Sequence, residues 1–207
     1  SRGLGDVYKR QVNVGSIKSG SGNDSITLNQ RLDNGIDTGA GDDTIRIYGS
    51  VGVGWNVSGA NHVRSGSGND LIELFGGSQR IEHYASTGGH SWDTHVFAGE
   101  GDDIVRLGNN KNYSRVYGES GNDTITDDSG SNILDGGSGN DNLTSRSLSG
   151  DHILKGGYGT DTLTATGKKV TLEGGDENDN IYAYGFIDKE GSRSYLEEGE
   201  ATITGGA

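Results

Sequence analysis

Branched aliphatic residues recur along the chain in pairs whose two members are nine positions apart. The first members are Ile17, Ile36, Val63, Val96, Val116, Leu134, Leu154 and Leu172, and the second members are Ile26, Ile45, Ile72, Val105, Ile125, Leu143, Leu163 and Ile181. The distance from one pair to the next varies between 9 and 24 residues. One half of each repeat therefore has a fixed length, whereas the other half only has to close a loop.

A six-residue unit fills the fixed half of every repeat. Its eight copies are SGSGND (19–24), TGAGDD (38–43), SGSGND (65–70), AGEGDD (98–103), GESGND (118–123), GGSGND (136–141), GGYGTD (156–161) and GGDEND (174–179). Each copy ends in Asp, two residues before the second aliphatic residue. Glycines at the second and fourth positions permit the positive φ angles of a tight turn.

This pattern predicts an all-β solenoid of short parallel strands. Each strand is expected to hold about three residues, to be about 10 Å long and to point a single aliphatic residue inward. No segment shows the apolar spacing of three and four residues that is typical of an amphipathic helix. Because neighbouring coils stack about 4.8 Å apart, the Asp of one turn should lie beside the Asp of the next turn.

Composition and charge limit what holds such a chain together. Among 207 residues there are 39 glycines, no proline, cysteine or methionine, and a net charge of −13. Few large apolar residues combined with this charge cannot form an ordinary hydrophobic core. The lack of cysteine excludes disulfides and thiolate metal sites. The apolar runs are too short for a membrane span, and the acidic charge disfavours nucleic acid as a partner.

The column of carboxylates indicates calcium as the cofactor. Two carboxylates about 4.8 Å apart repel each other by about 1 kcal/mol in water and by more in a protein environment. Calcium bound between neighbouring turns would reverse this repulsion, because it accepts carboxylate and backbone carbonyl oxygens in flexible geometry. Magnesium demands a tighter octahedron, and softer metals prefer His or Cys. Eight turns leave seven gaps, so up to about seven ions are expected.

These residues resemble the RTX (repeat-in-toxin), haemolysin-type calcium-binding nonapeptide, G-G-x-G-x-D-x-U-x, in which U is aliphatic. The resemblance covers residues 17–184 and implies a right-handed parallel β-roll that folds on binding calcium, with the variable loops on one side. It also implies a secreted, extracellular bacterial protein exported by type I machinery. The implied metal ligands lie in the turns: Asp24, Asp43, Asp70, Asp103, Asp123, Asp141, Asp161 and Asp179, with Gly20, Gly22, Gly39, Gly41, Gly66, Gly68, Gly99, Gly101, Gly121, Gly137, Gly139, Gly157, Gly159 and Gly175.

Three departures from the family pattern bear on these sites. The first position is Ser, Thr or Ala in the first four copies, which we expect to be a mild change because the carbonyl of that residue is retained. Glu119 replaces the second-position glycine of the fifth copy. Glu177 replaces the fourth-position glycine of the last copy, so the site at Asp179 is expected to be the weakest match.

The domain organisation that we expect is one roll over residues 12–207, truncated at its C-terminal end and belonging to a larger polypeptide. Residues 1–11 are expected to be a disordered or non-native leader outside the roll. The chain contains neither an H-E-x-x-H nor a G-x-S-x-G motif, and its Asp residues are spread along an axis instead of clustering. The module is therefore expected to be non-catalytic, with calcium, the rest of the polypeptide and cell-surface or polysaccharide ligands as partners.

Two other functions fit parts of the sequence. A carbohydrate-active parallel β-helix, a lyase or an epimerase, would place its site on the variable-loop face. Trp55, Tyr84 and Trp92 could then stack on sugars, although such residues more often pack a loop against the protein. A calcium-free adhesive solenoid is the other alternative, but it leaves the Asp column unexplained. Calcium-dependent folding would separate the first hypothesis from both.

Smaller features of the return segments give further expectations. His83, His90, Asp93 and His95 match no known zinc spacing and are expected to belong to a polar surface loop. Asp127 and Asp128, with Asn132 at an Asp-like position, form at most a weak half-site, and no calcium is expected near Lys168 and Lys169. The 27 residues between Asp43 and Asp70 leave open whether the column changes sides, and we favour a single long loop.

Overall fold

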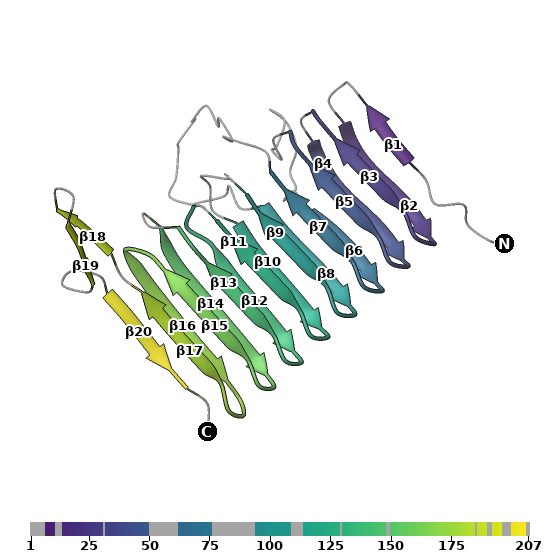
Figure 1. Cartoon of the computed structure of the whole chain (residues 1–207). Helices are drawn as coiled ribbons and strands as arrows, with labels where there is room; N and C mark the ends of the chain where they lie inside the picture. Colours follow the sequence, from purple (N-terminus) through teal and green to yellow (C-terminus); the bar gives the residue numbers. More distant parts are fainter. Residues whose placement is uncertain are drawn as a thin grey trace, which may run out of the picture.

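The computed structural model shows an all-β chain in which two parallel sheets run side by side along a common axis (Figure 1). It describes residues 7–10, 14–30, 32–49, 62–75, 94–108, 114–128, 130–147, 150–184, 186–189, 192–195 and 200–205. Within these ranges no helix is long and apolar enough to cross a membrane. The predicted fold class, a parallel β-roll, is confirmed by the two sheets and by their parallel strand pairing.

The chain alternates between the two sheets from β1 to β17. Odd-numbered strands build one sheet, and even-numbered strands up to β16, together with β20, build the other. Sheet A contains β1 (Val7–Arg10), β3 (Ser25–Leu28), β5 (Thr44–Ile47), β7 (Leu71–Leu74), β9 (Ile104–Leu107), β11 (Thr124–Asp127), β13 (Asn142–Ser145), β15 (Thr162–Thr166) and β17 (Asn180–Tyr184). Sheet B contains β2 (Val14–Ser21), β4 (Leu32–Ala40), β6 (His62–Ser67), β8 (Thr94–Glu100), β10 (Ser114–Ser120), β12 (Ile133–Ser138), β14 (Asp151–Tyr158), β16 (Lys169–Gly175) and β20 (Glu200–Thr204). A separate antiparallel hairpin joins β18 (Phe186–Lys189) to β19 (Ser192–Tyr195).

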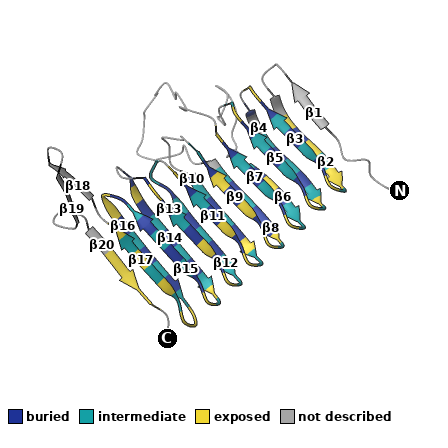
Figure 2. Cartoon of the chain, in the orientation of Figure 1, coloured by how far each residue is buried: buried dark blue, intermediate teal, exposed yellow. Residues whose placement is uncertain are grey.

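The two aliphatic series of the sequence lie opposite each other inside the roll. Residues of one series pair in register from strand to strand, as Val96 does with Val116 in sheet B and Val105 with Ile125 in sheet A. All are buried except Ile181, which is partly buried against the core. Figure 2 shows the resulting alternation of buried and more exposed positions along the strands that it colours by burial. The core is therefore one narrow column of side chains that each coil extends by one layer.

The strands are longer than the expected three residues. The sheet A strands from β3 to β15 have four or five residues and point two side chains inward, so Leu28, Ile47, Leu74 and Leu107 form an additional buried row. Sheet B strands have five to nine residues, because most of them continue into the first positions of the turn. The coil therefore buries more apolar surface than one aliphatic residue per strand would provide.

Strand pairing bears on two points of chain organisation, the place of residues 7–10 and the interval between Asp43 and Asp70. Residues 7–10, which were expected to lie outside the roll, form β1 and pair in parallel with β3. The edge strand of a sheet has unpaired backbone N–H and C=O groups, so a further segment can pair with it as a strand. The segment that forms β1 pairs with the edge of β3 in this way. The long interval between Asp43 and Asp70 is a single coil, because β5 pairs directly with β7 and β4 with β6. The column does not change sides.

The turns at one end of the coils have nearly identical backbones. Every glycine that the sequence analysis singled out in the second and fourth positions has a positive φ. Close stacking adds a second requirement at Gly99, because a β-carbon there would overlap the carbonyl oxygen of Gly66 in the preceding turn. Glu119 and Glu177 occupy two of these left-handed positions with φ angles of 76° and 74°. These two residues therefore carry backbone strain that the other turns avoid.

We predict that Glu119→Gly stabilises the folded chain by about 1 kcal/mol, because glycine removes the left-handed strain and only part of that gain is lost to unfolded-state entropy. Chemical denaturation in saturating calcium would measure the change. Ser120→Gly, at the next residue and outside the left-handed region, serves as the control and should not stabilise the chain. A Glu119→Gly variant no more stable than the parent would contradict this account of the strain.

Candidate metal centre

The eight Asp residues that end the turns form one continuous column. The backbone N–H of each Asp donates a hydrogen bond to Oδ1 of the Asp in the following turn, with N to Oδ1 distances between 2.7 and 2.9 Å. The column runs without interruption through Asp24, Asp43, Asp70, Asp103, Asp123, Asp141, Asp161 and Asp179. Seven coil-to-coil contacts therefore use one oxygen of each receiving carboxylate.

The other carboxylate oxygen, Oδ2, takes no part in these hydrogen bonds between turns. Oδ2 is buried and accepts no hydrogen bond in Asp43, Asp70, Asp103, Asp123, Asp141, Asp161 and Asp179. The side chains from Asp43 to Asp161 are at most 2% exposed. A buried charged oxygen without a partner strongly destabilises a fold unless a cation or a proton neutralises it. The repetition of the same unsatisfied atom in successive turns points to a shared ligand.

Burial also changes how readily these carboxylates hold a proton. Desolvation raises the pKa of Asp103 and Asp141 to about 7 and the pKa of Asp70 and Asp123 to about 6. The pKa of Asp43 and of Asp161 is also raised, with burial as the main cause. The hydrogen bond from the preceding backbone N–H opposes this effect, and in most of these residues repulsion by neighbouring carboxylates adds to it. Close to neutral pH, the column needs positive charge from another source.

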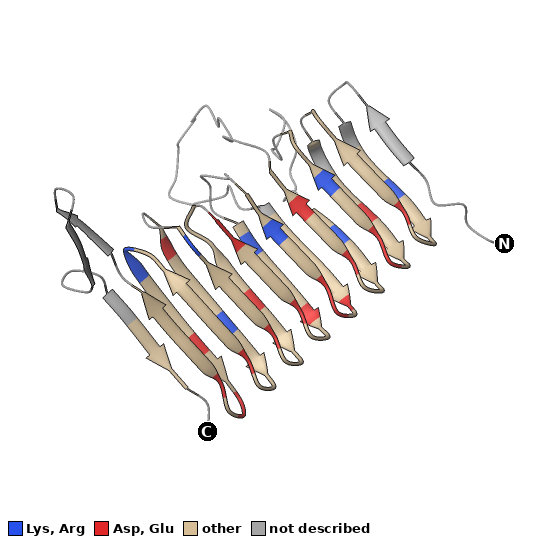
Figure 3. Cartoon of the chain, viewed as in Figure 1, with Lys and Arg blue, Asp and Glu red and all other residues tan. Residues whose placement is uncertain are grey.

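A second ladder follows the fifth position of the turns and runs in the opposite direction. Here the backbone N–H of each later turn donates to Oδ1 of the residue in the earlier turn, as Asn69 N does to Asp42 Oδ1 at 2.9 Å. The same bond recurs from Asn23 to Thr160 at 2.7–3.0 Å. Figure 3 shows acidic residues gathered along this row of turns. Sequence reasoning missed this ladder, although Asn or Asp at the fifth position of seven copies was a visible signal.

The groups that surround the unsatisfied oxygens supply only oxygen ligands. The turns contribute carboxylates and main-chain carbonyls, and the described residues contain no cluster of three or more His, Cys, Asp or Glu side chains. A site must therefore combine carboxylates of neighbouring turns with carbonyl oxygens. Such mixed oxygen sets are typical of calcium and unsuited to metals that prefer nitrogen or sulfur ligands.

Comparison with known protein families supports the same conclusion. The family model of the RTX calcium-binding nonapeptide repeat (4 copies) matches residues 55–78, 115–145 and 155–189. The chain contains RTX calcium-binding nonapeptide repeats. No curated protein and no solved structure gives a significant match. The matched segments include the turns that end in Asp70, Asp123, Asp141, Asp161 and Asp179.

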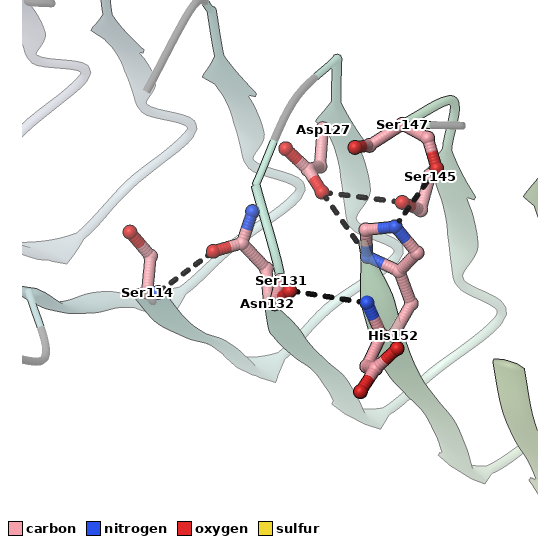
Figure 4. Close-up of polar contacts among 8 residues, drawn as sticks. Ser114, Asp127, Ser131, Asn132, Ser145, Ser147 and His152 are labelled. Carbon is pink, nitrogen blue, oxygen red and sulfur yellow. Dashed lines mark hydrogen bonds and ion pairs between the residues drawn. The ribbon is translucent and has the colours of Figure 1, made fainter. Parts of the chain in front are cut away.

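The return side of the RTX roll differs from its turn side. Within the core, Asp127 and Ser145 lie between Leu107 and Ala165 in the additional buried row of sheet A. Ser145 Oγ donates to Asp127 Oδ2 at 3.1 Å, and Nδ1 of buried His152 lies 3.6 Å from the same oxygen (Figure 4). Protein groups thus already contact the carboxylate that was considered for a weak half-site.

Asn132 and His152 complete this polar cluster, which consists of Asp127, Asn132, Ser145 and His152. Asn132 Oδ1 accepts the backbone N–H of Ser114 at 2.7 Å, which repeats the bonding pattern of the Asp column on the other side of the coil. His152 Nε2 lies 3.2 Å from the carbonyl oxygen of Ser147. Sequence reasoning singled out Asp127 and Asn132 but missed Ser145 and His152, because it followed only one inward residue per strand.

Aromatic and basic side chains gather on the outer face of sheet B. Phe97 and Tyr117 stack with ring centroids 5.1 Å apart, and the Arg64 guanidinium lies 4.9 Å from the Phe97 ring centroid. His62 and His95 pack beside them, with centroids 6.0 Å apart. The Phe97 ring is therefore covered by Tyr117 on one side and contacted by Arg64.

Several sequence predictions fall outside the described residues. Among the loop histidines and acids, only His95 is described, on β8. His83, His90, Asp93, Trp55, Tyr84 and Trp92 lie outside the described ranges. The expectation of a weak site at Asp179 stays a prediction; its Oδ1 accepts the Asp161 N–H at 2.9 Å, as in the other turns.

We predict that acid partly replaces calcium in folding the roll. In the unfolded chain Asp has a pKa near 3.9, so raised pKa values in the folded column favour the folded state at low pH and lose that effect as pH rises through about 6 to 7. In excess chelator, circular dichroism should therefore show more β structure at about pH 4.5 than at about pH 7.5.

The control for this experiment is the double variant Asp103→Asn and Asp141→Asn. Asn keeps an Oδ1 acceptor and does not titrate, so the double variant should show a smaller pH dependence than the parent. If the β content in chelator were the same at both pH values, the buried carboxylates would not govern folding.

We predict that Asp127→Ala lowers the free energy of unfolding by about 3 kcal/mol, because it leaves buried His152 and Ser145 without their shared partner. Asp128→Ala is the matched control: its ion pair with Arg146 is exposed, with side-chain exposures of 55% and 63%. That change should alter the free energy of unfolding by less than about 1 kcal/mol. Chemical denaturation in calcium would test both variants, and equal effects would rule out a structural role for the return-side cluster.

Proposed function

We propose that the chain is a calcium-binding RTX module in which calcium ions between successive turns join the coils and drive folding. The observation that carries this proposal is the column of buried Asp Oδ2 atoms that accept no hydrogen bond. The proposed ligands are the eight column carboxylates together with carbonyl oxygens of the glycine-rich turns. One ion in each gap would give up to about seven.

The energetic role of the ions follows from the charge of the column. Backbone N–H groups join successive carboxylates, and their hydrogen bonds only partly offset the burial and the repulsion that raise the pKa of Asp141. A divalent ion between two turns converts that repulsion into attraction and satisfies the orphaned oxygens at the same time. The glycine-rich chain has a large conformational entropy to lose, which makes folding dependent on this contribution.

The biological setting that we propose is extracellular. Extracellular calcium modules work with dissociation constants of about 10⁻⁴ to 10⁻³ M, a range in which a calcium-driven fold responds to secretion. We propose a secreted bacterial protein, in which this roll is a non-catalytic part of a longer polypeptide. Cell-surface or polysaccharide ligands remain proposed partners, and the carbohydrate-active alternative rests on aromatic residues outside the described ranges.

Calcium titration of the chelated chain tests the proposal. Circular dichroism at neutral pH should show a cooperative gain of β structure with calcium, and magnesium at the same concentrations should produce little of it. A chain that is fully folded in excess chelator at neutral pH, or one that fails to bind calcium, would overturn the proposal.

A charge-only substitution sharpens the test. Asp141→Asn preserves an Oδ1 acceptor for the Asp123 N–H but removes the negative charge, so the calcium midpoint should rise several-fold. Asp151→Asn removes one charge from an exposed residue at the start of β14 and should leave the midpoint nearly unchanged. Equal midpoints for the two variants would show that total charge, and not the column, controls folding.

A further inference from the structure

The residue at the first position of the turn divides the row of turns into two groups. In the first four turns this position holds a side chain, and in the last four it holds glycine. We call Ser19, Thr38 and Ser65 the hydroxyl group, and Gly118, Gly136, Gly156 and Gly174 the glycine group. Ala98 stands between the two groups. The first position lies next to the Asp column in every coil, so a side chain there would occupy space beside any ion bound between turns.

The hydroxyl group forms its own ladder. Ser19 Oγ donates to the carbonyl oxygen of Thr38 at 3.1 Å, Thr38 Oγ1 to that of Ser65 at 3.0 Å, and Ser65 Oγ to that of Ala98 at 2.7 Å. Thr38, Ser65 and Ala98 are fully buried. In these three gaps, therefore, the first-position carbonyl of the later turn already has a proton donor from the earlier turn.

At two turns of the glycine group, two oxygen atoms converge on the space that a side chain would fill. A β-carbon at Gly118 would overlap Asp123 Oδ2 of its own turn and would lie 2.5 Å from the Gly136 carbonyl oxygen of the next turn. At Gly156 a β-carbon would overlap both Asp161 Oδ2 and the Gly174 carbonyl oxygen. The carboxylate oxygens at this point, in Asp123 and Asp161, are buried and accept no hydrogen bond.

The two arrangements exclude each other at a given turn. Thr38 and Ser65 carry a β-carbon at the place that the carboxylate oxygen approaches in the glycine group, so Asp43 and Asp70 cannot bring Oδ2 to the same point. Their hydroxyls donate to the next-turn carbonyl and also lie close enough to the carboxylate of their own turn to oppose the rise in its pKa. Two oxygens that converge without a proton between them favour a cation, whereas a hydroxyl and a carbonyl form a neutral bond.

We propose that the column contains two classes of calcium site. Turns of the glycine group bind calcium tightly, and turns of the hydroxyl group, joined by their own hydrogen bonds, bind it more weakly. Ala98 marks the boundary, because its methyl group fills the space without donating a hydrogen bond. This inference rests on the proposed calcium function and differs from the expectation that a first-position Ser or Thr is a mild change.

Calcium binding to the unmodified chain gives the first test. Isothermal titration should resolve a tight and a weak class of sites, which differ in dissociation constant by about tenfold, the effect of one charge-assisted contact. Hydrogen–deuterium exchange at intermediate calcium should show residues 118–179 protected before residues 19–70. Simultaneous protection of both segments, with a single class of sites, would overturn the inference.

Ser65→Gly gives the decisive variant because its expected effect is a gain. Removing the hydroxymethyl group should open the space beside Asp70 and move one ion from the weak to the tight class. Ser67→Gly is the matched control, since it makes the same chemical change two residues later in the same turn, away from the first position. It should leave the distribution of sites unaltered.

The possible outcomes separate the two proposals. Absence of calcium binding by the unmodified chain would reject the proposed function. Calcium binding that neither substitution redistributes would reject only the two classes of site. An equal gain from Ser65→Gly and Ser67→Gly would show that turn flexibility, and not the first-position space, sets calcium affinity, and would also reject the inference.

Discussion

The stacking of like charges governs this structure. A solenoid whose coils repeat one Asp at one place must bring that Asp next to its copy in every coil, and the narrow core leaves each carboxylate buried. Backbone N–H donors satisfy Oδ1 of the column carboxylates from Asp43 to Asp179, and Oδ2 of these residues accepts no hydrogen bond. The remaining features of the turns, their glycines, carbonyls and second ladder, can be understood as the means of holding those carboxylates close together until a cation joins them.

The two sides of the coil solve the problem of buried polar groups in different ways. On the turn side the coils from Asp43 to Asp179 present the same unsatisfied oxygen, which suits a repeated external ligand. On the return side, where coil lengths vary, Asp127 is contacted by Ser145 and His152 of later coils. Where neighbouring coils differ in sequence, one coil can supply a polar side chain that contacts the buried carboxylate of another. On the turn side the same Asp recurs in every coil, so each Asp has another Asp as its neighbour in the column.

Much of the architecture could be predicted because the pattern is locally encoded. The fixed nine-residue spacing between residues such as Val116 and Ile125 specified both sheets, and the turn glycines specified the left-handed positions. The sequence did not reveal the inward-facing Asp127 or the patch around Phe97 and Tyr117. Their partners lie 18 to 33 residues away, at distances that depend on variable loops. The role of Ser65 was also hidden, since only the stacked coils show which carbonyl its hydroxyl reaches.

The opposite directions of the two turn ladders have a consequence for how such a roll is lengthened. A coil added beyond the last turn would accept a hydrogen bond through its sixth-position Asp and donate one through its fifth-position N–H, and each interior coil already does both. The coils that carry Asn or Asp at the fifth position therefore present the same pair of ladder edges to their neighbours, whereas Thr160 has no Oδ1 to accept the next N–H. Among those coils a duplication or deletion preserves both ladders, so the number of coils is a property that gene duplication can change.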